Sequence, residues 1–189
     1  MKNNLIRIFD ILISSILLIF SFPLMILISV AIYFADGRPV LFKQVRVGID
    51  GKTFKILKFR TMKEKIIQNE PDRLFGLGKI LRQLSFDEIP QFLNVLKNEM
   101  SIVGPRPLPQ INEGKITKKL KEKRRKILPG ITGLSQINYS GKYRKLDDKV
   151  KLDLIYVENY TLLNYFKIII KTPLVLVVRL LRNRSSIIK

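Results

Sequence analysis

The sequence contains no cysteine and no histidine among its 189 residues. The absence of cysteine excludes disulfides, thiolate metal sites and thiol nucleophiles. The absence of histidine removes the commonest general base and the commonest zinc ligand. Any catalysis by this chain therefore depends on carboxylates, lysine, arginine, hydroxyls, backbone amides or a hard cation.

Acidic residues are also scarce: there are 15 of them against 35 lysines and arginines, which gives a formal net charge of +20. Such a balance indicates a polyanionic partner, either nucleic acid or an anionic membrane surface. Hydrophobic residues make up 47% of the chain, which is unusual for a plain nucleic-acid binder. The length leaves room for one domain with a real core, so the placement of the apolar residues matters more than their total.

The longest apolar stretch lies near the N-terminus, where residues 11–35 carry no charge. An unbroken helix of this length could span a bilayer. However, Pro23 stands at its centre and removes a backbone hydrogen bond, while Ser21 is placed to satisfy a freed backbone group. Each half then reaches only partway through the ~30 Å hydrocarbon layer.

Both flanks of this stretch are basic, with Lys2 and Arg7 before it and Arg38 as the first cation after it. Under the positive-inside rule both ends prefer the cytoplasmic side. We therefore expect a re-entrant membrane helix over residues 1–36, broken at its proline, and a cytoplasmic domain over residues 37–189. A kinked helix that spans the membrane is the alternative.

The remaining chain predicts an α+β fold that is mostly helical. Alternating residues predict strands over 42–47 and 54–59, which are joined at the hairpin dipeptide Asp50-Gly51. Three prolines make residues 101–109 an extended, stiff loop. Helices are expected over 73–83, 85–98, 113–126 and 147–160, and a turn over 129–133.

The C-terminal run over residues 162–181 is apolar but is interrupted by charged residues and by Pro173. The charges argue against a membrane span. An amphipathic helix or helix pair in the membrane interface, with its cations toward lipid phosphates, fits the pattern, and a core helix of the soluble domain is the alternative. The basic residues of 115–126 are expected to help hold this face against anionic lipid.

An adjacent pair of carboxylates, Asp87 and Glu88, lies in the run SFDEIPQFLNVL at 85–96. Ser85 and Glu88 have the spacing of a capping box, and Asp87 would lie in the first helical turn, where negative charge favours the helix dipole. The pattern is therefore compatible with a structural cap and with two carboxylates placed for chemistry.

Several basic residues have settings suited to phosphate. Lys58 and Arg60 are two apart at the end of a predicted strand and so should face the same side. Arg106 stands between two prolines, where a guanidinium on a stiff loop offers a bidentate fork. Arg82 precedes Asp87 by five residues. Each cation taken alone is a solvated surface charge, but with the carboxylates they form the inventory of a phosphoryl-transfer site with Mg²⁺ on the acidic oxygens.

Four motifs follow one another in the chain: RVGIDGKTFKILKFRTM (46–62), LRQLSFDEIPQFLNVL (81–96), MSIVGPRP (100–107) and PGITG (129–133). With these motifs, the chain from Arg7 to about Val157 resembles the small monotopic phosphoglycosyl transferases. These are bacterial sugar transferases that load polyprenyl phosphate. Their members insert a re-entrant helix broken at a proline, which agrees with the interpretation of the N-terminal stretch.

The resemblance implies a two-step transfer of a sugar-1-phosphate from a UDP-sugar to polyprenyl phosphate. Asp87 would attack the β-phosphate, UMP would leave, and the acceptor phosphate would then take the phosphosugar from the carboxylate. Asp87 and Glu88 would hold Mg²⁺, or Glu88 would orient the nucleophile. The residues expected to bind substrate phosphate are Lys58, Arg60, Arg82 and Arg106.

The implied partners are a UDP-sugar, polyprenyl (undecaprenyl) phosphate and anionic membrane lipid, at the cytoplasmic face of the bacterial inner membrane. Transfer there would initiate a lipid-linked surface glycan. A membrane-tethered nucleic-acid binder would explain the basic charge but not the Pro-Arg-Pro segment beside the acidic pair, and no known nucleic-acid motif is present. An inactive family member that acts as a scaffold is the other alternative.

The sequence departs from the family pattern at two places. The family usually has serine directly before the membrane proline, where this chain has Phe22. After PGITG the family commonly reads Gln-Val-x-Gly-Arg, whereas this chain reads QINYS at 136–140. The preference for a particular sugar therefore does not transfer from the family to this chain.

Overall fold

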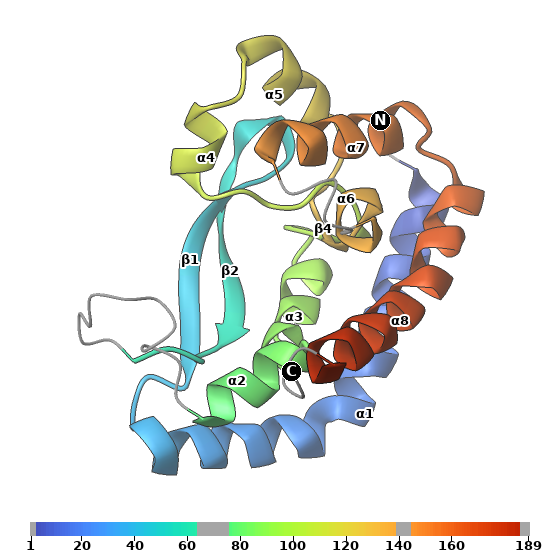
Figure 1. Ribbon diagram of the computed structural model, residues 1–189. Helices are drawn as coiled ribbons and strands as arrows, with labels where there is room; N and C mark the ends of the chain where they lie inside the picture. Colours follow the sequence, from blue (N-terminus) through green and yellow to red (C-terminus); the bar gives the residue numbers. More distant parts are fainter. Residues whose placement is uncertain (1–2, 64–75, 139–144, 186–189) are drawn as a thin grey trace.

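A computed structural model describes residues 3–63, 76–138 and 145–185, so the end of the divergent run after PGITG lies outside the described residues. In the described part, helices predominate beside one antiparallel and one parallel pair of strands, which confirms the predicted α+β, mostly helical fold. The strands are β1 (Leu41–Val47), β2 (Thr53–Phe59), β3 (Ser101–Val103) and β4 (Gly130–Thr132) (Figure 1). The α-helices are α1 (Asn4–Asp36), α2 (Gly76–Gln83), α3 (Gln91–Leu96), α4 (Gln110–Gly114), α5 (Lys118–Arg124), α6 (Leu134–Ile137), α7 (Leu146–Glu158) and α8 (Leu162–Ser185), and the short 3₁₀ turns include η1 (Ile49–Gly51) and η3 (Phe86–Glu88).

The predicted hairpin is present. Strands β1 and β2 pair antiparallel, with Leu41 opposite Phe59 at the open end. At the connection, Asp50 and Gly51 have φ values of 52° and 79°. Aspartate tolerates and glycine favours this left-handed region, which is why the Asp-Gly dipeptide marks the turn correctly.

Helix α1 contains Pro23 and changes direction partway along, so that its two halves follow two sides of the molecule (Figure 1). Proline has no N–H to donate to the carbonyl one turn earlier, and this favours a bend. The hydroxyl of Ser21 donates to the carbonyl of Leu18 at 3.5 Å. Among the described residues, α1 is the one helix long and apolar enough to cross a membrane by length and composition.

The two ends of α1 are packed, but its middle is not. Ile6 belongs to the main core, which also contains Met100 and Tyr165. Ile32, near the other end, belongs to a second core cluster with Phe59. Between these ends, exposed apolar side chains include Ile19, Phe20, Phe22 and Leu27. The helix therefore attaches to one body of protein at both ends.

Asp10, which directly precedes the uncharged stretch, is buried. Its Oδ1 accepts hydrogen bonds from the Ser101 hydroxyl (3.0 Å), the Ile102 amide (2.8 Å) and the Tyr165 hydroxyl (2.8 Å). These bonds join α1 to β3 and α8. The first turns of α1 are thus part of the core of the domain that follows them.

Strands β3 and β4 form a parallel pair, with Ser101 aligned with Gly130. The Gly104 amide continues the ladder by donating to the carbonyl of Thr132 at 2.9 Å. The predicted turn at 129–133 is therefore wrong, because its centre is a strand. Three residues that include a glycine carry no alternating pattern from which a strand could be predicted.

The helices at 76–83 and 146–158 confirm two predictions, but two other predicted helices are interrupted. The expected helix over 85–98 divides into η3 and α3, and Pro90 occupies the N-cap position of α3. The expected helix over 113–126 divides into α4 and α5, with the break after Gly114. Glycine favours helix ends.

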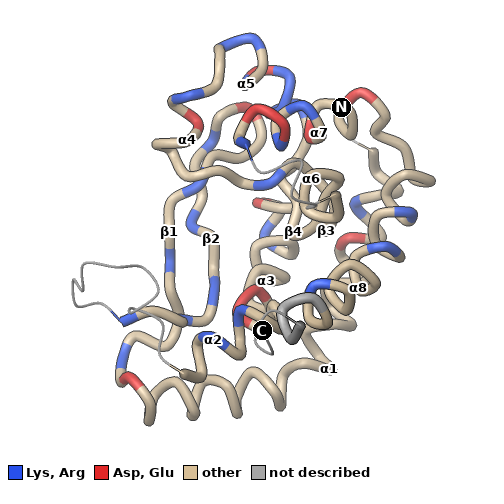
Figure 2. Tube along the Cα trace, in the orientation of Figure 1, with Lys and Arg blue, Asp and Glu red and all other residues tan. Residues whose placement is uncertain are grey.

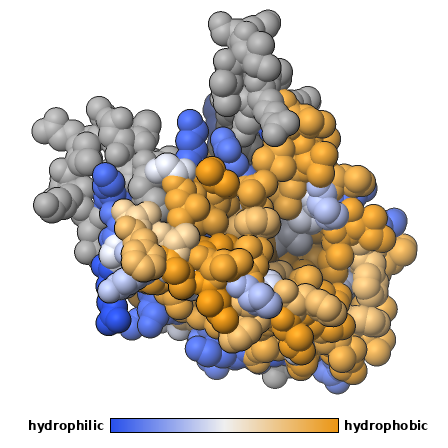
Figure 3. All heavy atoms as spheres, turned by 90° about the horizontal axis from the view of Figure 1, so that it is seen from below, coloured by the Kyte–Doolittle hydropathy of each residue, from blue (hydrophilic) through white to orange (hydrophobic). Residues whose placement is uncertain are grey.

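Helix α8 is a single helix that contains Pro173. Tyr165 and Ile168 are in the core, as the core-helix alternative predicts, whereas other apolar residues of α8 are exposed. Together with the exposed middle of α1, these side chains form what we call the apolar surface, and a broad hydrophobic area dominates the view in Figure 3. Its members on α8 include Leu163, Ile170, Leu174, Val177 and Val178. The predicted contact of this helix with the membrane interface stays a prediction.

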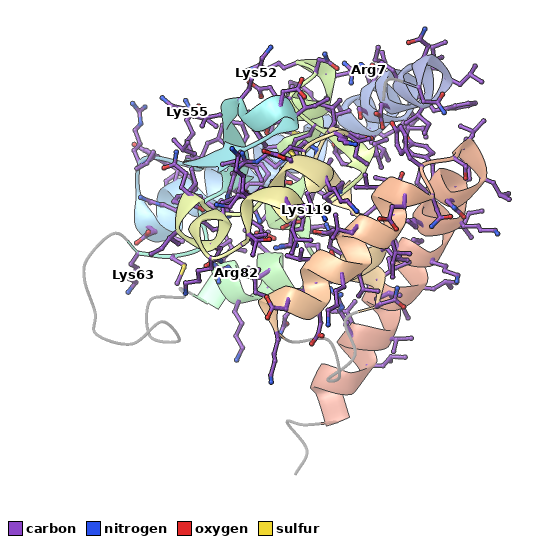
Figure 4. All side chains as sticks on the ribbon, turned by 90° about the horizontal axis from the view of Figure 1, so that it is seen from above. Arg7, Lys52, Lys55, Lys63, Arg82 and Lys119 are labelled. Atoms are coloured by element: carbon purple, nitrogen blue, oxygen red, sulfur yellow. The ribbon has the colours of Figure 1, made fainter. Side chains whose placement is uncertain are left out.

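The basic helix α5 lies at the far end of the molecule from the C-terminal half of α1 (Figure 1). Figure 4 views the opposite side from Figure 3, and it shows Lys119 of α5 together with Lys52 and Lys55 of the hairpin. This placement does not support contact between the 115–126 run and lipid at the apolar surface.

Candidate active site

The carboxylate pair lies in η3, beside the end of β2 and the end of α2. Figure 2 shows acidic and basic positions close together in the region of α2, α3 and the lower end of β2. Lys58 Nζ lies 2.5 Å from Glu88 Oε1 and 4.0 Å from Asp87 Oδ2. The structure therefore brings together Lys58, Asp87 and Glu88, three of the predicted site residues.

The two carboxylates have opposite electrostatic environments. Burial raises the pKa of Asp87 to about 6; Glu88 acts in the same direction, while Lys58 and Arg82 oppose the shift. Burial also opposes ionisation of Glu88, but Lys58 and Arg106 outweigh it and hold the Glu88 pKa below its usual value. The surroundings therefore favour the ionised form of Glu88 and disfavour the ionised form of Asp87.

The predicted capping box does not form. Ser85 has a left-handed backbone conformation (φ 58°) and its side chain makes no cap hydrogen bond. The Glu88 carboxylate pairs with Lys58 instead of the amide of Ser85. The reason is tertiary, because a lysine on β2 provides a charged partner for Glu88 that the local pattern does not reveal.

Arg82 lies in the last turn of α2, and its Nε donates to the Thr61 hydroxyl at 2.9 Å. This helix approaches the chain after β2 closely, since a Cβ added to Gly78 would lie 2.2 Å from the carbonyl oxygen of Thr61. The side chain of Arg82 is near enough to lower the Asp87 pKa. The close packing therefore holds Arg82 beside the carboxylate pair.

The structure does not bring Arg60 into this cluster. Strand β2 ends at Phe59, so the alternation that relates Lys58 to Arg60 does not continue. The Arg60 guanidinium is buried, pairs with Asp36 at 3.1 Å and donates to the carbonyls of residues 36–38. These contacts satisfy the C-terminal carbonyls of α1, and they give no support to a phosphate-binding role.

Arg106 is the one exposed residue of the fully described run 101–108. The main chain around it is fixed, because the Gly130 amide donates to the carbonyl of Pro105 at 3.0 Å. Its charge lowers the pKa of Glu88, which places it within electrostatic reach of the pair. The predicted loop over 101–109 is wrong for its first three residues, which form β3. The part that follows this strand presents a single guanidinium toward the site.

Arg46 is a residue that the sequence analysis did not single out. In the hairpin register Arg46 lies opposite Phe54 and Lys58 lies opposite Phe42, so alternation places both cations on one face. Arg46 donates to the carbonyl of Pro107 at 3.3 Å. Burial and the nearby Arg106 lower the pKa of Arg46. Once the strand register is known, the alternation of side chains identifies Arg46 as a cation on the same face as Lys58.

The described residues contain no group of three or more metal-binding side chains of the types His, Cys, Asp and Glu. At the candidate site, the possible metal ligands are the carboxylates of Asp87 and Glu88, and Lys58 pairs with one oxygen of each. Mg²⁺ is commonly held by one or two carboxylates together with substrate phosphates and water. The donor set is thus compatible with a cation shared between protein and substrate.

These features define a class: a membrane-associated protein with two adjacent carboxylates, one of them buried, beside cations suited to phosphate. The sequence profile of the family described as bacterial sugar transferase matches residues 1–179. The chain belongs to this family.

Individual relatives agree with the assignment. The chain is 38% identical over 179 residues to the UDP-glucose:undecaprenyl-phosphate glucose-1-phosphate transferase of Klebsiella pneumoniae, covering 88% of this chain and 38% of the relative. It is 41% identical to the uncharacterized sugar transferase EpsL of Bacillus subtilis, covering 88% and 84%, and 36% identical to the exopolysaccharide production protein ExoY of Sinorhizobium fredii, covering 88% and 82%. The chain thus spans well under half of the first relative and most of the other two.

The Asp87 environment predicts an unusual titration. In the metal-free protein we expect the Asp87 carboxyl to titrate near pH 6, since burial outweighs its cationic neighbours. Replacing Lys58 with methionine removes the larger of the two opposing charges and should raise this pKa further. Carboxyl-carbon NMR of labelled aspartate, assigned with Asp87→Asn, measures both values. A midpoint near pH 4 in the unmodified protein would contradict the expected environment.

Proposed function

We propose that this protein transfers a sugar-1-phosphate from a UDP-sugar to polyprenyl phosphate, with release of UMP. The observation that carries the proposal is the buried Asp87 carboxylate, with Glu88 and Lys58 beside it and Arg82 and Arg106 within electrostatic reach. Relatives named as undecaprenyl-phosphate glucose-1-phosphate transferases support this reaction class.

In the first step, an oxygen of Asp87 forms a bond to the β-phosphorus of the UDP-sugar. The bond from that phosphorus to the bridging oxygen breaks, and UMP leaves with the bridging oxygen. Lys58, Arg82 and Arg106 reduce the repulsion between the anionic nucleophile and the diphosphate. In the second step, a phosphate oxygen of the acceptor attacks the same phosphorus and restores the carboxylate.

Asp87 and Glu88 would hold Mg²⁺ through the carboxylate oxygens that Lys58 does not contact. When bound, the cation would neutralise charge on the phosphate oxygens. Glu88 is suited to this part because its pKa is held low, so that it stays ionised. Asp87 is suited to attack because a carboxylate with a raised pKa is more basic, and hence a stronger nucleophile, than an ordinary one.

The site lies next to the membrane helix, which suits a lipid-linked acceptor. Phe86, which precedes Asp87, packs against the cluster that contains Ile28 and Ile32 of α1. A phosphate at the lipid headgroup level could therefore reach the carboxylates without crossing the bilayer. The position of the site beside α1 therefore supports a lipid-linked phosphate as the acceptor.

A re-entrant path of α1 is part of this proposal. Arg7 near the start of α1 donates to the carbonyls of Val95 (2.8 Å) and Leu96 (3.2 Å). At the other end of α1, the Arg60 guanidinium donates to the carbonyls of Gly37 and Arg38. Since both ends attach to one domain, the exposed middle would enter the membrane and return, leaving the domain on the cytoplasmic face.

Because the chain lacks cysteine, single cysteines can test this topology. Asn4→Cys and Lys43→Cys lie beyond the two ends of the apolar stretch and are exposed. In sealed vesicles of known orientation, a membrane-impermeant maleimide should label both from the cytoplasmic side and neither from the other. Labelling of the two sites from opposite sides would establish a spanning helix instead.

The reaction itself is tested with a panel of UDP-sugars, undecaprenyl phosphate and Mg²⁺, followed by measurement of UMP and of the lipid product. Turnover with at least one donor, dependent on the acceptor, is the expected result. A folded protein that turns over no donor in the panel would favour the scaffold alternative.

A further inference from the structure

A cluster of charged side chains lies outside the carboxylate site, against the segment of residues 104–107, which we call the Arg106 loop. Arg124 Nη1 lies 2.9 Å from Glu113 Oε1, and its Nη2 lies 3.0 Å from Asp153 Oδ2. Arg125 Nη2 lies 2.8 Å from Glu113 Oε2. The elements that meet here are α4, α5 and α7.

Arg124 is the centre of this cluster. Only 4% of the residue is exposed, and its three nitrogens all donate. Nε and Nη1 donate to the carboxylates of Asp153 and Glu113, and Nη2 donates to the main-chain carbonyl of Arg106 at 2.5 Å. A buried ion pair contributes little net stability because desolvation offsets the attraction. The contribution of Arg124 is therefore better sought in the position that it gives to the Arg106 main chain than in the stability of the fold.

Contacts to the main chain hold four consecutive residues of the loop. The Gly104 amide donates to Thr132, and the Pro105 carbonyl accepts from Gly130. The Arg106 carbonyl accepts from Arg124, and the Pro107 carbonyl accepts from Arg46. The side chain of Arg106 is the exposed group that this fixed segment presents.

We propose that Arg124 is a positioning residue, which fixes the Arg106 main chain so that the exposed guanidinium meets a phosphate group of the donor or the acceptor. This inference rests on the proposed function, because it takes Arg106 as a phosphate ligand. Glu113 and Asp153 hold the Arg124 guanidinium from two sides and so set its direction. Lysine cannot replace it, since one ammonium cannot contact three separate partners in the planar geometry of a guanidinium.

The test is a double-mutant cycle on ligand affinity in the Asp87→Asn background, with UDP and undecaprenyl phosphate as separate probes. Arg124→Lys should weaken one of them by about tenfold, as expected when a bidentate phosphate contact is misplaced. In the presence of Arg106→Gln, the same change should have less than about a twofold effect, because the group it positions is gone. The probe that responds identifies the phosphate as donor or acceptor.

Lys123 provides the matched control on the same helix. Its ion pair with Glu158 is 3.6 Å long and exposed, so Lys123→Met should leave both affinities unchanged. If Arg124→Lys does not fold, Asp153→Asn enters the same cycle, because it removes one of the charges that orient Arg124 while keeping the shape.

Equal weakening with and without Arg106→Gln would show a merely structural role and overturn the inference, as would unchanged affinity for both probes in the variant that replaces Arg124 or Asp153. Failure of the proposed function is distinguishable. Arg106→Gln would then leave both affinities unchanged, or the unmodified protein would show no transfer.

Discussion

The Asp87→Asn variant is expected to release UMP at least about 10⁴-fold more slowly than the unmodified protein, which is the scale of losing a nucleophile. An amide has the shape of the carboxylate but lacks the negative charge, so its oxygen is too weak a nucleophile for the attack. UMP formation from a UDP-sugar, measured at pH 7.5 with acceptor present, checks the loss.

The same substitution should not weaken the fold. The folded-state pKa of about 6 lies above the ordinary value of 3.8, so ionised Asp87 destabilises the protein as pH rises through this range. Asparagine carries no charge, so the thermal unfolding midpoint of the Asp87→Asn variant at pH 7.5 should equal or exceed that of the unmodified protein. Glu158→Gln, at an exposed carboxylate, is the control and should keep full activity. UMP release by Asp87→Asn at the normal rate would end the nucleophile assignment.

The Gly130→Ala variant should show the largest loss of stability, about 3 kcal/mol or more, since backbone atoms leave no space for the methyl group. A Cβ at Gly130 would lie 2.0 Å from the Gly104 nitrogen and 2.4 Å from the carbonyl oxygen of Thr132. The parallel strands would have to separate, and the ladder bond between these two neighbours would be lost. The Arg106 loop follows directly, so transfer activity should fall as well.

Gly114→Ala is the matched control, because a Cβ there meets no atom within 4 Å. Alanine should shift the free energy of unfolding by less than about 1 kcal/mol. Denaturant unfolding of both variants provides the comparison. Equal stability of Gly130→Ala and the unmodified protein would contradict the close approach of β3 and β4.

Patterns that depend on neighbouring residues predicted the fold well. The hairpin was predictable because Asp50-Gly51 has the required turn chemistry and the flanking residues alternate. The strand at 130–132 was not predictable, because its partner strand lies almost thirty residues earlier in the chain. Its pairing also depends on a close approach between the backbones of Gly130 and Gly104. The capping box at Ser85 failed for a similar reason, since Glu88 finds a stronger partner on β2.

The candidate site shows the same division. The acidic pair and Lys58 meet as the sequence predicts, whereas the Arg60 side chain binds the end of α1 because β2 stops one residue earlier. Arg124 was hidden inside a run of basic residues. It follows Leu120 by four residues and so shares the apolar face of α5. A charge on such a face is the signal that could have identified it.

The central claim is that the phosphosugar is carried by Asp87, and intact-protein mass spectrometry tests it most directly. The protein is incubated with the UDP-sugar and Mg²⁺ in the absence of acceptor. The expected result is a burst of UMP and an increase in the mass of the protein by one sugar phosphate. A proteolytic digest should place this added mass on the peptide that contains Asp87, and undecaprenyl phosphate should then remove it. UMP release that requires the acceptor, with no mass increase at any stage, would show a single direct displacement and contradict the claim.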